Sequence, residues 1–219
     1  MSGEKPAVIL SFMVSPVQPF IEAARSLRDL WSGSYILSVM AAHAINTLQG
    51  RVQQLQGTAE LITPSVDASH PLLRLARKES LSDKDKQEAT RPSLPNKFAA
   101  LVRGLDDEQL VKLATEIKQS AKAAWNILAA DVRSQIDAEM KKLGGDDWGR
   151  NWDQQVESYF EFQCAWLDAT ADAATEAWYE DWSMLGKLME ATRCVRHVMC
   201  PTTCRRLTAT ENSRRSAVC

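Results

Sequence analysis

The fold is decided near the N-terminus by the stretch Ala7-Val8-Ile9-Leu10-Ser11-Phe12-Met13-Val14-Ser15-Pro16-Val17-Gln18-Pro19-Phe20-Ile21. Its first eight residues are nearly all apolar, which is typical of a strand buried on both faces. Pro16 and Pro19 then favour a turn and the first turn of a helix. The sequence therefore predicts a strand, a bend and a helix in succession.

The helix predicted after the bend has one apolar face. Arg25 and Arg28 lie three residues apart on its opposite side, and Gly33 is expected to interrupt it. A second helix, over 35–49, is apolar almost all round and is therefore expected to be buried. The apolar face of the first helix carries Phe20, Ala24, Leu27 and Trp31.

Further along the chain, 60–63 is predicted to form a second strand, and 65–95 a long polar surface loop with at most a helical turn. Residues 97–102 fit a strand or a helix. A long helix is predicted to begin with the capping box of Asp106 and Gln109 and to end at Gly144. Two more helices are predicted from tryptophan spacing, one with Trp148, Trp152 and Trp166 and one with Trp178, Trp182, Leu185 and Met189.

Composition fits a globular chain with an unusual end. Of the 219 residues 45% are hydrophobic, enough for a real core, and no run reaches the ~18 apolar residues of a membrane span. The N-terminus does not resemble a signal peptide, so a cytoplasmic location and no membrane contact are expected. Residues 194–219 hold five Arg and one acidic residue, whereas residues 1–193 carry a net charge of 21 − 27 = −6. The acidic body argues against a broad nucleic-acid-coating surface, so little direct nucleic-acid contact is expected.

Four of the five cysteines crowd the last 26 residues at spacings that fit no zinc knuckle. This tail has no hydrophobic periodicity and is predicted to be disordered or aberrant. One hypothesis is that it is translated out of frame at the end of a truncated gene; the alternative is a genuine basic arm. The chain thus divides into 1–105, 106–193 with mostly helices, and the tail 194–219.

The motif Gly144-Gly145-Asp146-Asp147 invites a catalytic interpretation. In polymerase-like palms and diguanylate cyclases, such a motif lies on a hairpin between apolar strands and its carboxylates hold Mg²⁺. Here both flanks have helical patterns, which favours one helix ending and another beginning. No His/Asp set has metal-ligand spacing, His43 is expected in the core, and Cys164 is expected to be a buried thiol.

The bend Ser15-Pro16-Val17-Gln18 has a stronger claim to bind a ligand. It joins the end of a strand to the start of a helix, where α/β folds place phosphates, and Ser15 and Gln18 can donate hydrogen bonds. The alternative is an ordinary strand-to-helix turn. Arg25 and Arg28 fit either a partner contact or a solvated face paired with Glu22 and Asp29.

The residues from Pro16 to Tyr35 resemble the start of the first palm-like domain in the large, polymerase-related subunit of type III-B CRISPR effector complexes. A second element, Leu94-Pro95-Asn96-Lys97-Phe98, is also similar to that family. The resemblance covers about residues 7–190 and is specific over the first 38. The matching positions are Pro16, Val17, Gln18, Phe20, Ile21, Ala24, Arg25, Arg28, Asp29, Leu30, Trp31, Gly33, Ser34 and Tyr35.

The resemblance implies that this chain works only as one part of a larger protein assembly. Family members are several times longer and make cyclic oligoadenylate from ATP in RNA-guided antiviral defence, using a second palm; some also carry a nuclease domain. This chain lacks both catalytic parts, and Ser15 stands where an active palm offers a carboxylate. The resemblance therefore implies no catalytic residue and no metal here, no cofactor for this chain alone, and an ATP-facing role of Ser15–Gln18 only in the full-length protein. The implied partners are the other subunits of a complex with guide RNA.

The expected architecture is a helix-rich α+β fragment holding an incomplete ferredoxin-like palm, strand-helix-strand, with a large helical insertion. An unpaired sheet edge would make it marginally stable or prone to aggregate. Two alternatives stay open at this point. One is a helical scaffold or partner-binding domain unrelated to CRISPR, and the other is a nucleotide cyclase that uses Asp146 and Asp147.

Overall fold

The computed structural model describes residues 7–144, 147–169, 176–196 and 216–218. An antiparallel sheet with the spatial order β2-β3-β1-β4-β5 forms its centre. The expectation of a helix-rich α+β fold is confirmed, and so are the strands predicted at 7–14 and 60–63. Residues 97–102, which fitted a strand or a helix, form a strand. The strands are β1 (Val8–Ser15), β2 (Thr58–Thr63), β3 (Lys97–Arg103), β4 (Glu161–Asp168) and β5 (Ser216–Val218).

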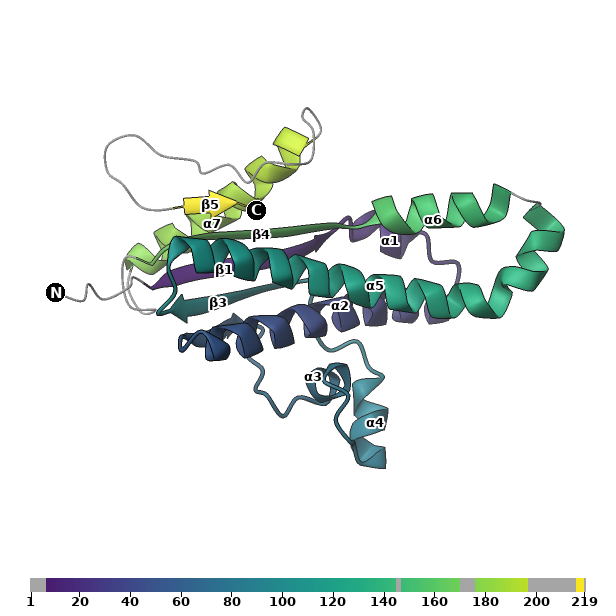
Figure 1. Cartoon of the computed structure of the whole chain (residues 1–219), viewed down its shortest axis with the longest axis horizontal. Coiled ribbons are helices and arrows are strands. Elements are labelled where there is room, and N and C mark those ends of the chain that lie inside the picture. The colour runs from purple at the N-terminus through teal and green to yellow at the C-terminus, as the bar shows by residue number, and fades with distance from the viewer. Residues whose placement is uncertain (1–6, 145–146, 170–175, 197–215, 219) are drawn as a thin grey trace.

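Two long helices, α2 (Leu27–Gln54) and α5 (Asp107–Gly144), pack side by side on one face of this sheet (Figure 1). Side chains alternate between the two faces of a strand, so every second residue of β1 points toward these helices. Phe12 of β1 stacks on Phe98 of β3 with ring centroids 5.1 Å apart. The main core therefore lies between the sheet and the α2–α5 pair.

The helix α7 (Glu176–Arg196) covers part of the opposite face. A smaller apolar cluster forms there between the sheet and α7. Its buried members are Ile9, Leu101, Ala165 and Leu167 from the strands, with Leu185 and Met189 from α7. The sheet is therefore buried on both sides, as the apolar sequence of β1 predicts.

The prediction of one helix from Trp148 through Trp166 is wrong in its second half. The helix α6 (Asp147–Tyr159) ends before Phe160, and residues 161–168 form β4. This strand pairs with β1 along its whole length, from Ser15↔Glu161 to Val8↔Asp168. Helical spacing of the tryptophans was misleading because Trp166 lies on a strand, where Phe162, Cys164 and Trp166 face the main core. Residues 106–193 are therefore not a purely helical insertion, and the sheet is not left incomplete beside β1.

The break in the first helical segment also lies elsewhere than expected. α1 (Gln18–Glu22) has only five residues, and α2 begins after Ser26, whose hydroxyl accepts a hydrogen bond from the Asp29 N–H. This is a side-chain N-cap. Gly33 lies inside α2 and does not interrupt it.

Two short helices, α3 (Pro71–Ala76) and α4 (Asp83–Ala89), occupy the segment predicted to be a polar loop. They extend from the α2 side of the molecule (Figure 1). The capping box at the start of α5 is confirmed, because Asp106 and Gln109 each accept a hydrogen bond from the other's backbone N–H.

The Cys- and Arg-rich tail falls mostly on residues 197–215 and 219, which lie outside the described residues. Within it, residues up to Arg196 end α7 and Ser216–Val218 form β5, and the expectation for the rest of the tail stays a prediction. Of the helices in the described ranges, none has the length and apolar character needed to cross a bilayer.

Candidate functional site

The bend Ser15–Gln18 leaves the sheet at the end of β1, as the sequence predicts. Ser15 is 8% exposed and pairs with Glu161 of β4, and the Ser15–Pro16 peptide bond is cis. Gln18 is exposed, and its side-chain amide donates a 2.8 Å hydrogen bond to Glu22 within α1. Val17 precedes α1 in a helical conformation without a side-chain cap. Since α1 has five residues, its dipole gives an anion less support than the long helix expected after the bend.

An aromatic cluster fixes α1 to the rest of the molecule. The ring of Phe20 lies edge-on to Phe160 and to Tyr159, with centroids 4.9 and 5.6 Å apart. Trp125 of α5 joins the cluster through Phe160 at 5.0 Å, and its indole N–H donates to the Val156 carbonyl at 2.9 Å. The bend is therefore held by residues more than a hundred positions away, which no local pattern indicates.

Beside this cluster a groove of about 560 Å³ opens between α1, α2, α5 and α6. The lining includes the aromatic rings of Phe20, Trp125 and Trp152 and the small residues Ala24 and Gly33. Such a volume with mostly apolar walls is within the range of ligand pockets. No local sequence pattern indicates this groove, because its walls come from four separate helical segments.

The two candidate contact arginines lie at the start of α2. Arg25 lines the groove, and its backbone N–H donates to the Asp29 carboxylate at 3.2 Å. Arg28 is exposed on the first turn of α2. Glu22 was expected to pair with the arginines, but its carboxylate accepts a hydrogen bond from the Gln18 side chain. The two guanidinium groups and the Ser15–Gln18 bend thus lie on consecutive segments at one end of the sheet.

The Gly-Gly-Asp-Asp motif connects two helices. α5 ends at Gly144 and α6 begins at Asp147, whose carboxylate is ion-paired with Arg150. Gly145 and Asp146 lie outside the described residues. The helical flanks predicted from the sequence are confirmed, and they differ from the strand-hairpin-strand setting in which such carboxylates hold Mg²⁺. Within the described ranges, no three His, Cys, Asp or Glu side chains are grouped as a metal site.

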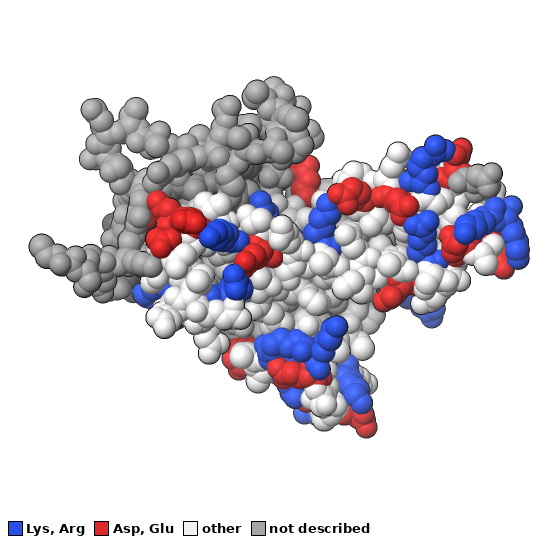
Figure 2. Space-filling view, in the orientation of Figure 1, with Lys and Arg blue, Asp and Glu red and all other residues white. Residues whose placement is uncertain are grey.

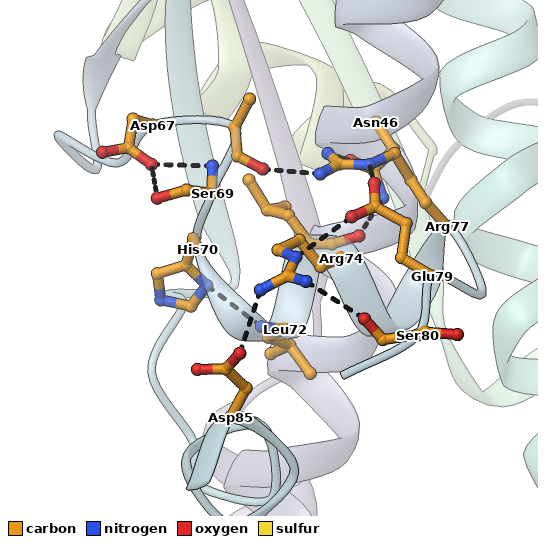
Figure 3. A network of polar contacts seen from close by, with 12 residues as sticks. Asn46, Asp67, Ser69, His70, Leu72, Arg74, Arg77, Glu79, Ser80 and Asp85 are labelled. Atoms are coloured by element: carbon orange, nitrogen blue, oxygen red, sulfur yellow. Dashed lines mark hydrogen bonds and ion pairs between the residues drawn. The ribbon is translucent and has the colours of Figure 1, made fainter. Parts of the chain in front are cut away.

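A second polar cluster joins α3 and α4 to α2 (Figure 3). The Arg74 guanidinium donates to Glu79 and Asp85, each at 3.0 Å, and Arg77 donates to Asn46 of α2, also at 3.0 Å. Hydrogen bonds from Arg77 and Arg74 lower the pKa of the Glu79 carboxyl. Because these charges neutralise one another, the cluster serves to hold the 65–95 segment against α2.

His43, His70 and Cys164, whose surroundings the structure describes, occupy structural positions. His43 on α2 is half-buried, and burial lowers its pKa, with a further lowering by Lys78. His70 caps α3, where its Nδ1 accepts from the Leu72 N–H at 3.3 Å. Burial raises the pKa of the Cys164 thiol to about 12, so the prediction of a buried thiol is confirmed, although on a strand.

Charges on the surface are mixed. On the face drawn in Figure 2, basic and acidic side chains of the described residues lie next to each other around a largely uncharged centre. A nucleic-acid-coating surface would instead gather Lys and Arg on one side. The clusters on this face therefore favour local pairing over binding to a polyanion.

Comparisons with known proteins agree with the resemblance in the N-terminal sequence. A family model described as CRISPR-associated protein Cmr2, N-terminal, matches residues 9–130, more than half of the chain. The CRISPR system Cmr subunit Cmr2 of Pyrococcus furiosus is 31% identical over 115 residues, which are 52% of this chain and 12% of that protein. The chain therefore matches only about an eighth of the length of that curated relative. A chain in the cryo-EM structure of a type III-B Cmr-beta complex bound to cognate target RNA is similar over 89% of this chain and 24% of its own length, with 15% identity and a TM-score of 0.49.

Proposed function

The chain belongs to the family of N-terminal regions of the CRISPR-associated protein Cmr2, and on that premise we propose that it is a non-catalytic, palm-like wall of the large subunit in a type III-B complex. Family membership argues against a helical scaffold unrelated to CRISPR. The proposed role is to help bound an ATP site completed by other parts of the large subunit, and to contribute to assembly with the other subunits and their guide RNA in the cytoplasm.

The order of the strands in the sheet supports the proposal that this domain is palm-like. The main elements follow one another as β1-α2-β2-β3-α5-β4, and the strands lie in the order β2-β3-β1-β4. A β-α-β-β-α-β unit of this kind is ferredoxin-like. Both long helices lie on one face, as in that fold. This supports a complete ferredoxin-like unit in place of the partial one expected from the sequence.

We propose no catalytic role for the chain by itself. Palm chemistry needs carboxylates that can hold a metal between strands. At the end of β1 the chain offers Ser15, and Asp147 begins a helix and is paired with Arg150. The cyclase alternative is therefore disfavoured on the geometry of its own motif.

We infer separate roles for the bend and for the two arginines. Ser15, Pro16, Val17 and Gln18 face the nucleotide in the assembled protein, which is supported by their place at the end of a central strand. Arg25 and Arg28 contact a protein partner, which is supported by their exposure on the same end of the sheet. Neither role requires the chain alone to bind ATP.

Reconstitution with the rest of the large subunit and the other type III-B subunits tests assembly. We expect Arg25→Glu with Arg28→Glu to weaken association by at least about tenfold, because charge reversal at a contact is repulsive. Lys84→Glu with Lys86→Glu on α4 is the matched control, since it reverses two exposed charges far along the chain. Equal binding by both double variants would refute the proposed contact.

The nucleotide role is tested in the same assembled complex. Gln18→Ala should raise the KM for ATP while leaving assembly unchanged, since Gln18 is exposed and only bonded within α1. A KM equal to that of the unmodified complex would remove the bend from the ATP site. ATP turnover by the chain alone that disappears in Asp147→Ala would instead establish the cyclase alternative.

A further inference from the structure

The α7 face of the sheet contains a buried amide side chain. Gln163 of β4 is 1% exposed and lies opposite Met13 of β1. Ala165 and Leu167, two and four residues further along β4, belong to the apolar cluster under α7. Because strand side chains alternate between faces, Gln163 points to this same face.

The amide of Gln163 has no hydrogen-bond partner among the described residues, at either its nitrogen or its oxygen. Ser11, on the same face of β1, is equally buried but donates to the Phe98 carbonyl at 3.3 Å. An amide removed from water without a partner disfavours the state in which it is buried. The covered arrangement therefore carries a penalty at Gln163 that hydration of the amide would remove.

Among its described side chains, α7 contributes few apolar groups to this face, although its Asp181 is also buried. Of the α7 side chains that the structure describes, Leu185 and Met189 are the fully buried apolar ones, and Trp182 and Leu188 are half-buried. Gly186 lies in the middle of α7, where an added Cβ would meet no atom within 4 Å. Packing therefore does not require glycine at this position, and glycine weakens the helix relative to alanine.

We propose that α7 is a displaceable cover, which leaves the sheet in a minor state while β1, β3 and β4 stay folded. In the covered state Leu185 and Met189 shield Ile9, Leu101 and Leu167, and Gln163 is dry. In the uncovered state water satisfies the amide and the apolar face becomes accessible. The balance between the favourable apolar contact and the unpartnered amide sets the population of each state.

Hydrogen exchange on the full chain, followed by peptide, measures this opening. The α7 amides are expected to exchange faster than those of α2, because local opening exposes them without global unfolding. Gln163→Met keeps a similar volume and removes the unpartnered amide, so it should slow α7 exchange by about tenfold or more. The α2 amides should change much less.

Two further variants test the same opening in case Gln163→Met perturbs the packing of the sheet. Gly186→Ala should slow α7 exchange by about fivefold through helix propensity alone. Ser11→Ala is the matched control on the same face and should not slow it, because its hydroxyl already has an acceptor. The proposal is overturned if α7 and α2 are equally protected in the unmodified chain, if Ser11→Ala slows α7 as much as Gln163→Met, or if neither Gln163→Met nor Gly186→Ala slows it.

Discussion

The two faces of the sheet are built from the same strands but are covered very differently. On one face α2 and α5 lie across the strands and bury a continuous core that includes Phe12 and Phe98. On the other, Leu185 and Met189 are the fully buried apolar side chains among those described in α7, and the unpartnered Gln163 is buried on this same face. Because strand residues alternate, the strands set which side chains are available on each face. The covering helices decide how strongly each face is stabilised.

The largest effect is expected on the α2–α5 face. Phe12→Ala removes a fully buried ring from the centre of the sheet, and we expect it to lower the free energy of unfolding by about 3–5 kcal/mol. Chemical denaturation of the full chain, followed by far-UV circular dichroism, measures this loss. A loss below about 1 kcal/mol would mean that this face is not the main core.

A glycine at the edge of the same core gives the next effect. A Cβ on Gly57 would lie 2.5 Å from Leu105 Cδ1 and 2.6 Å from the Arg103 carbonyl oxygen. Because that oxygen belongs to the backbone of a paired strand, it cannot swing aside, and Gly57→Ala should cost about 1–3 kcal/mol. Gly50→Ala on α2, where an added Cβ meets nothing within 4 Å, is the control and should stabilise by up to about 1 kcal/mol.

The buried thiol gives a pH test of the α2–α5 face. Since burial raises the pKa of Cys164 to about 12, the unfolded chain loses this proton near its ordinary pKa while the folded chain keeps it. Stability should therefore fall between about pH 9 and 12, by up to about 1.4 kcal/mol per pH unit from this residue. Cys164→Ala should lose this part of the slope, measured as the difference between the two unfolding profiles. Identical slopes would mean that Cys164 is exposed to water.

The smallest effect is expected under α7. Leu185 is 2% exposed, yet Leu185→Ala should lower the global free energy of unfolding by less than about 1 kcal/mol, below the usual range for a buried leucine. The reason is that α7 opens before the sheet unfolds, so its contacts contribute little to the final cooperative step. A loss similar to that of Phe12→Ala would remove the difference between the two faces.

Local sequence was sufficient to predict much of the α2–α5 face of the sheet. The apolar run at 7–14 predicted β1, and the reciprocal pairing of Asp106 and Gln109 predicted where α5 begins. β4 was mistaken for helix because tryptophans at helical spacing continue from α6 into it. Six of the eight residues from Phe160 to Leu167 are apolar, and this composition is the signal for a buried strand.

The candidate site was predictable in position but not in surroundings. The bend at Ser15–Gln18 lies where the prolines indicated, but the N-cap of α2 at Ser26 was not predicted. The groove beside it could not be predicted, because Phe20 and Trp125 meet only when α1 and α5 pack.

The strand at 8–15, the bend after it and the long helices follow from local sequence alone, because each depends on residues close together in the chain. Long-range packing alone places β4 beside β1, puts α2 and α5 on one face, and buries Gln163 on the opposite face. These outcomes depend on which distant segments exclude water from one another, and that choice is made by the packing of the whole chain.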